Sequence, residues 1–124
     1  MHKEDSRGLE MKSSSIELAP RLRPFSGVEM AVLGSGNKMT FMNIIMQPGA
    51  VIPDHSHLNE QIGTCLQGEG ELRSGGDILK VTSGVSWTIP ADEPHSFMVK
   101  GDQIVILYEV FSPPREDYMS IANG

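Results

Sequence analysis

The sequence has little cysteine, little positive charge and no long apolar run, and each scarcity excludes a class of protein. Its single cysteine, Cys65, has no partner for an internal disulfide, so a reducing cytoplasm is the expected setting. Ten Lys and Arg residues stand against 16 Asp and Glu residues, which gives a formal net charge of −6. Nucleic acids and anionic membrane surfaces need a basic face, so neither is an expected partner.

The absence of long apolar segments argues against membrane insertion. The longest mostly apolar stretches, 41–46 and 104–111, fall far short of the roughly 20 residues that a membrane-spanning helix needs. Residues 1–7 are mostly charged and no apolar segment follows them, so we expect no secretory signal. A length of 124 residues leaves room for one domain with a substantial core. We therefore expect a single-domain cytoplasmic protein.

The chain divides into a polar start and a long segment of short apolar runs. Residues 1–15 hold too little apolar surface to offset the entropy of ordering, so we predict a mobile N-terminal segment, followed by one domain at 16–124. No helix-length periodic pattern occurs after residue 16, and Gly and Pro clusters interrupt the apolar runs every eight to twelve residues. The predicted strands are 28–33, 38–47, 62–67, 71–74, 78–81, 85–89, 96–99 and 103–111.

Short strands at even spacing indicate an all-β sandwich or barrel. Several of these strands are apolar on both faces over part of their length, as if the outer surface were also covered. A homodimer would cover it.

Two histidines one residue apart are the most informative feature. On an extended strand His55 and His57 project to the same side, where their neutral nitrogens form a two-point metal clamp. Gln61 shares their odd parity, and His95 begins another predicted strand. A His-x-His pair alone is more often part of a surface or core than a ligand pair. Glu60 would replace Gln61 if the register differed by one, but parity places Glu60 on the opposite face.

Two segments resemble the sequence motifs of the cupin superfamily. The first motif is a glycine, five residues, His-x-His, three residues, Glu or Gln, six residues and a glycine, and its places are filled by Gly49, His55, His57, Gln61 and Gly68. The second motif is matched by Gly84, Pro90 and His95, whereas Asp92 stands where it has glycine and Val99 where it has asparagine.

The resemblance implies a single-domain cupin β-barrel of the double-stranded β-helix or jelly-roll type. The implied metal ligands, inside the barrel, are His55, His57, Gln61 and His95. Because this ligand set carries no charge, a divalent ion would keep its full charge, which favours polarising an anionic or hydroxyl-rich substrate over redox cycling. Zn, Ni, Fe, Co and Mn all suit such a site.

The last predicted strand contains one carboxylate in an apolar run. A charge there is costly unless it is paired or functional, and Glu109 shares a face with Phe111 by alternation. The segments 55–63 and 109–118 resemble the pectin-degradation cupins that act on unsaturated uronates, in which the strand carboxylate is aspartate. This resemblance implies that Glu109 transfers a proton, that Phe111 shapes the substrate pocket, and that Arg115 is a catalytic residue that grips the substrate carboxylate. The alternative is a surface pair of Arg115 and Glu116, with Glu109 at an exposed edge.

The leading hypothesis is therefore a metal-dependent lyase or isomerase whose partner is a small anionic sugar. The resemblance implies ring opening of the 4,5-unsaturated uronates released from pectin or alginate. A dioxygenase or another sugar isomerase using the same site is the second hypothesis, and a non-enzymatic cupin that binds a small molecule is the third. We also expect Trp87 and Phe97 to line or plug the barrel and Cys65 to point inward.

Overall fold

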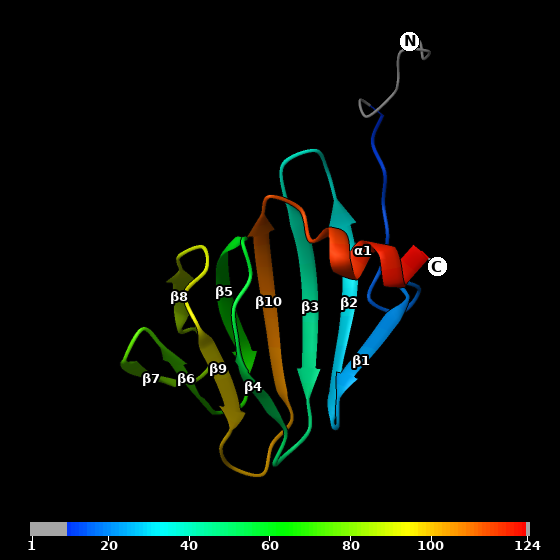
Figure 1. Ribbon diagram of the computed structural model, residues 1–124. Helices are drawn as coiled ribbons and strands as arrows, with labels where there is room; N and C mark the ends of the chain where they lie inside the picture. The colour runs from blue at the N-terminus through cyan, green and yellow to red at the C-terminus, as the bar shows by residue number, and fades with distance from the viewer. Residues whose placement is uncertain (1–9, 124) are drawn as a thin grey trace.

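The computed structural model describes residues 10–123 (Figure 1). Residues 1–9 of the predicted mobile segment lie outside this range, and residues 10–15 are exposed and form no helix or strand. Among the described residues, no helix has the length and apolar content to cross a membrane. In chain order the elements are β1 Arg21–Phe25, β2 Val28–Ser35, β3 Thr40–Met46, β4 Val51–His55, β5 Glu60–Gln67, β6 Gly70–Ser74, β7 Asp77–Val81, β8 Ser86–Ile89, β9 His95–Val99, β10 Val105–Ser112 and α1 Glu116–Asn123.

The strands form two antiparallel sheets that enclose the core. The larger sheet has six strands in the order β1-β2-β3-β10-β5-β8, and the smaller has four in the order β4-β9-β6-β7. Alternation places one face of each strand inward, and the buried side chains of both sheets form one apolar cluster. This arrangement confirms the predicted all-β jelly-roll barrel.

The structure adds two strands and a helix to the predicted set. Strands β1 and β4 contain Pro24 and Pro53, and both lie at a sheet edge, where a missing N–H costs no ladder hydrogen bond. The prolines break the apolar alternation that marks the other strands. The expectation of no helix after residue 16 is wrong, because α1 spans eight residues. Its first turn contains Glu116 and Asp117, whose charges favour a helix N-terminus.

Sharp turns occur at the motif glycines and direct the strands that carry the histidines. Gly49, Gly68 and Gly84 have φ angles of 82°, 96° and 91°, which glycine adopts without strain. Asp92, which stands in the place of the second motif's glycine, also has a left-handed φ of 65°. Aspartate tolerates that conformation better than most residues. The departure from the motif therefore keeps the turn that precedes His95.

Candidate metal centre

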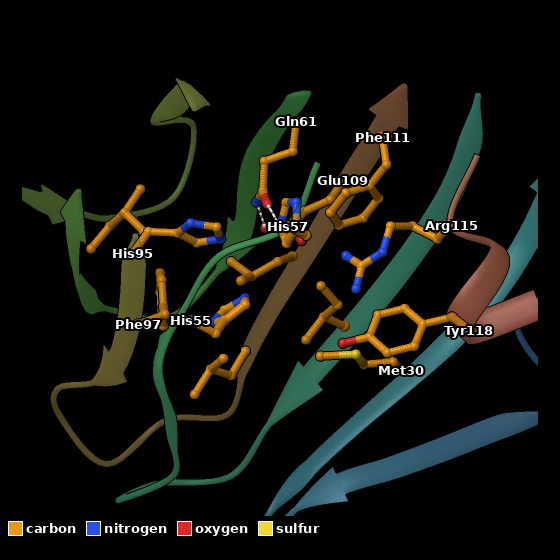
Figure 2. Close-up of a pocket in the computed structure, with 14 residues that line it drawn as sticks. Met30, His55, His57, Gln61, His95, Phe97, Glu109, Phe111, Arg115 and Tyr118 are labelled. Atoms are coloured by element: carbon orange, nitrogen blue, oxygen red, sulfur yellow. Dashed lines mark hydrogen bonds between the residues drawn. The ribbon is translucent and has the colours of Figure 1, made fainter. Parts of the chain in front are cut away.

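The four-stranded sheet and the loop after its strand β4 bring three histidines together inside the barrel (Figure 2). His55 ends β4, His57 lies in the loop that follows, and His95 begins β9. The antiparallel pairing of β4 with β9 places His55 directly opposite His95. One ring nitrogen from each of the three histidines lies within 4.8 Å of the other two. These three predicted residues thus meet in space, although His57 lies in a loop and not on the extended strand that the parity argument assumed.

Each of these histidines holds its Nδ1 against a backbone carbonyl two residues away. The acceptors for His55, His57 and His95 are the carbonyl oxygens of Pro53, Asn59 and Glu93, at 2.8, 3.0 and 2.8 Å. A neutral imidazole that donates from Nδ1 carries its lone pair on Nε2. The backbone therefore orients all three rings with Nε2 free to bind a metal, as the outer partners of metal-binding histidines commonly do.

Gln61 lies beside the three histidines, and its side-chain amide contacts both His57 and Glu109. Its Oε1 lies 2.9 Å from Nε2 of His57, and its Nε2 donates to Oε2 of Glu109 at 3.1 Å. Burial first, and then the positive charges of Arg115 and His95, lower the pKa of His57 to about 4. One ring nitrogen of each histidine and the amide oxygen of Gln61 are uncharged ligand atoms that divalent transition metals accept, so the chemistry of the donor set fits such an ion.

Glu109 lies in the interior rather than at an exposed edge. Its side chain points inward from β10 and is 8% exposed. Burial raises the pKa of Glu109 to about 7, although Arg115 and the indole of Trp87 lower it in part. This carboxyl can hold or release a proton near neutral pH.

A glycine in the middle of β5 makes room beside this carboxyl. Gly63 pairs with Glu109 on one side and with Trp87 on the other. A Cβ at Gly63 would lie 2.6 Å from the indole Nε1. Among the described residues the buried N–H of Trp87 forms no well-aligned hydrogen bond, yet it lies near enough to Glu109 to lower the pKa of that carboxyl. Sequence reasoning missed Gly63, although a glycine inside a strand signals a close approach.

Arg115 is buried and held between two aromatic rings. Its Cζ lies 4.0 Å from the ring centre of Tyr118 and 4.8 Å from that of Phe111. Its Nε and Nη2 donate to the carboxylate of Asp117 at 3.1 and 2.8 Å. The alternative of a surface pair with Glu116 is therefore wrong in both partner and burial. Asp117 thus accepts hydrogen bonds from Nε and Nη2, which leaves Nη1 for other partners.

Asn59 connects the metal centre to the segment that carries Arg115. Its carbonyl accepts the Nδ1–H of His57, and its side-chain Nδ2 donates to the carbonyls of Pro113 and Pro114 at 2.6 and 3.3 Å. The side chain is 4% exposed. Sequence reasoning missed this residue, and the only signal was an amide two positions after a candidate ligand.

Glu93 orients His95 in the way that Asn59 orients His57. Its carbonyl accepts the Nδ1–H of His95, and its carboxylate accepts a hydrogen bond from the hydroxyl of Ser74. The β6–β7 hairpin therefore holds the loop that orients His95. Nothing in the local sequence pattern indicated this contact.

A cavity of about 30 Å³ lies among the three histidines, Gln61, Glu109 and Arg115. A single ion or water molecule fits such a volume. All seven predicted site residues line it, namely His55, His57, Gln61, His95, Glu109, Phe111 and Arg115. Phe97 and Tyr118 also line the cavity, whereas Trp87 packs behind Glu109. Glu60 is exposed, which confirms that it lies on the opposite face from Gln61. Cys65 points inward as expected, and burial raises the pKa of its thiol, which argues against a nucleophile.

Comparisons with known proteins agree with this architecture. The structure is similar to a crystal structure of an RmlC-like cupin from Shewanella frigidimarina, with a TM-score of 0.79, 26% identity, and coverage of 88% of this chain and 96% of that one. It also resembles the fold of KdgF from Halomonas sp., with a TM-score of 0.76, 20% identity, and coverage of 88% and 98%.

Part of the chain is also similar in sequence to a transcriptional regulator. The chain is 35% identical over 75 residues to the HTH-type transcriptional regulator PuuR of Escherichia coli (strain K12), a match that covers 57% of this chain and 40% of that protein. The chain thus spans about two fifths of the length of the curated relatives that it matches. The cupin domain family matches residues 42–111, which is more than half of the chain and contains both histidine motifs. The chain therefore belongs to the cupin family.

Proposed function

We propose that this cupin is a metal-dependent enzyme that opens the ring of 4,5-unsaturated uronates. One observation carries the proposal: the buried carboxyl of Glu109 and the buried guanidinium of Arg115 line the same cavity as the three histidines. The resemblance of segments 55–63 and 109–118 to the pectin-degradation cupins supports the choice of substrate. We place the activity in the cytoplasm, where the single buried thiol of Cys65 stays reduced.

The donor set described above would hold one divalent transition metal. His55, His57 and His95 would bind it through Nε2 and Gln61 through Oε1. Zn, Ni, Fe, Co and Mn all accept such ligands. When bound, the ion supplies positive charge that polarises a substrate hydroxyl.

Ring opening of an unsaturated uronate is a redox-neutral proton relocation. The anomeric hydroxyl loses its proton, the bond between the anomeric carbon and the ring oxygen breaks to give an aldehyde, and the ring oxygen keeps the electron pair as an enolate. Carbon 4 then receives a proton, and carbon 5 becomes a ketone. One proton leaves and one returns, so no oxidant or reductant is needed. Glu109, with its pKa near 7, carries the proton between the two positions in this proposal.

The remaining pocket residues bind and orient the sugar acid. Nη1 of Arg115 binds the substrate carboxylate, and Phe111 forms the apolar wall beside it. The chain as a whole carries a net charge of −6, which repels an acidic sugar. Because Asp117 pairs with the guanidinium, a divalent ion held by the uncharged ligand set would supply the positive charge that attracts the substrate.

The test is to follow the loss of double-bond absorbance when the metal-loaded protein meets unsaturated galacturonate. We expect a rate well above that of buffer, and a fall of about 100-fold or more in Glu109→Gln, because positioned proton transfer contributes about that much. Glu60→Gln, which changes an exposed carboxylate on the opposite face, is the matched control and should keep its rate. A wild-type rate no better than buffer would refute the proposal.

The match to the transcriptional regulator PuuR favours a second candidate, a non-enzymatic cupin that binds a small molecule. Calorimetric titration separates the two. Binding of the uronate with no turnover in the absorbance assay identifies a binding module, whereas turnover identifies the enzyme.

A further inference from the structure

The cavity at the metal centre is much smaller than a sugar acid. Its volume of about 30 Å³ holds one ion or one water molecule, whereas pockets for small organic molecules measure roughly 300–1,000 Å³. A molecule of that size can therefore reach the histidines only after one wall of the cavity has moved. The walls are inward side chains of the strands and, on one side, Tyr118, which extends from α1 beside Arg115 (Figure 2).

The two kinds of wall differ in how they are held. Strand β10, which carries Glu109 and Phe111, pairs with β3 on one side and with β5 on the other. Strand β9, which begins at His95, likewise pairs with both β4 and β6. Helix α1 has only eight residues, too few to be stable without packing. Between the described residues, no hydrogen bond joins 116–120 to a strand. The helix is therefore the wall that moves at the lowest cost.

The chain that leads into α1 is anchored as far as Arg115. The backbone N–H of Arg115 donates to Oγ1 of Thr40 at 2.9 Å, and Thr40 is fully buried. Immediately before it, the carbonyls of Pro113 and Pro114 accept hydrogen bonds from the side chain of Asn59. These contacts hold one end of the helix in place, so α1 can turn about this point without disturbing the strands.

Side-chain contacts close α1 onto the buried guanidinium. The ring centre of Tyr118 lies 4.0 Å from Cζ of Arg115, and the carboxylate of Asp117 accepts hydrogen bonds from Nε and Nη2. Tyr118 and Met119 also pack against the apolar core, which includes Met30. All of these contacts can break and form again while both sheets stay intact. Short elements held in this way open at a lower free energy than the core of a fold.

We propose that α1 is a lid over the cavity and that Tyr118 determines which molecules enter. The closed lid admits an ion or a water molecule, and the open lid exposes Arg115 and the wall behind Tyr118 to a molecule the size of a sugar acid. Such a lid also excludes water once a substrate is bound. This inference rests on the proposed function only for the identity of that molecule.

The test measures how fast a thiol behind Tyr118 reacts with N-ethylmaleimide in the full chain. Met30 lines the cavity and is 4% exposed, so Met30→Cys places a thiol there. The native thiol of Cys65 is 2% exposed and lies elsewhere in the core, so its labelling reports opening of the barrel itself. Mass spectrometry of peptides distinguishes the two thiols.

Two further substitutions are made in the Met30→Cys protein. Tyr118→Ala should speed labelling of the introduced thiol about tenfold, because it removes the stacking on Arg115, and should leave the rate of Cys65 unchanged. Asp117→Asn keeps the ring and weakens the contact that holds the helix, so it should speed the same labelling about threefold. The matched controls on α1 are Ser120→Ala and Glu116→Gln, which change exposed residues and should leave both rates unchanged.

Three results would overturn the inference. The first is an introduced thiol that reacts equally fast with and without Tyr118→Ala, and the second is an equal acceleration of Cys65, which would mean that the whole barrel opens. The third is an unchanged rate in Asp117→Asn, because Tyr118 would then be a fixed plug; this variant also decides the matter if Tyr118→Ala does not fold. Labelling needs neither metal nor sugar, so a failure here is distinct from a failure of the uronate assay.

Discussion

Removing the titratable group of Glu109 should change how stability depends on pH. The pKa of this carboxyl rises from an ordinary 4.5 to about 7 in the folded protein, chiefly because it is buried. Between these values the folded chain binds a proton that the unfolded chain has released, so the free energy of unfolding falls as the pH rises. Ionisation of Glu109 therefore leaves the free energy of unfolding unchanged below about pH 4.5. Above about pH 7 it lowers that free energy by its full amount. At roughly 1.4 kcal/mol for each pH unit, the difference between the two pKa values corresponds to about 3 kcal/mol.

The assay compares urea denaturation of wild type and Glu109→Gln between pH 4 and pH 8, with metal removed by a chelator. Glutamine keeps an acceptor for the amide of Gln61 and cannot ionise. The variant should gain about 3 kcal/mol relative to the wild type over this range. The depressed pKa values of His57 and His95 act in the opposite direction, but they are common to both proteins and cancel in the difference. A difference in the free energy of unfolding that stays constant with pH, or that favours the wild type as the pH rises, would refute the raised pKa of the buried carboxyl.

Three further substitutions address the packing and support of the site. Gly63→Ala should destabilise the fold by about 1–3 kcal/mol in thermal unfolding, because its Cβ would meet the indole of Trp87 at 2.6 Å. Asn59→Ala should weaken metal binding about 10- to 100-fold by freeing the loop whose carbonyl orients His57, which a competition titration with a chelator measures. Arg115→Lys should raise the KM for the uronate about tenfold or more while metal content stays unchanged, because lysine cannot keep the paired contacts and the aromatic stacking. A gain of stability, unchanged metal affinity or an unchanged KM would contradict these three expectations in turn. The exposed controls, in the same order, are Gly34→Ala, Asn37→Ala and Arg23→Lys.

The parts of the site that follow from short-range rules could be predicted from the sequence. Alternation along β5 separated Gln61 from Glu60. The motif spacing brought His55 and His57 to the same cavity, although His57 lies in the loop after β4 and not on a strand. The same rule placed Glu109 and Phe111 on one inward face. The motif spacing added His95 because its glycines and prolines determine where the strands turn.

The contacts that could not be predicted join residues far apart in the sequence. Asn59 reaches Pro113 across 54 positions, and the carboxylate of Glu93 meets Ser74 across 19. No local pattern encodes such pairs, since they depend on which strands pair within a sheet and on how the two sheets pack. The pairing of Arg115 with Asp117 is local, but it depends on helix α1. That helix could not be predicted, because its eight residues have mixed polarity and form too short a pattern.

Metal binding by the histidine cluster and Gln61 is the central claim, and a titration of metal-free protein with Co²⁺, followed by its visible absorption, tests it most directly. The arrangement of Nε2 and Oε1 atoms predicts one ion per chain in the wild type and in Glu60→Gln. His57→Ala should bind at least 100-fold more weakly, because it removes a ligand nitrogen and the contact with Gln61. Absence of binding at one ion per chain, or equal affinity in His57→Ala and the wild type, would contradict the metal centre described above.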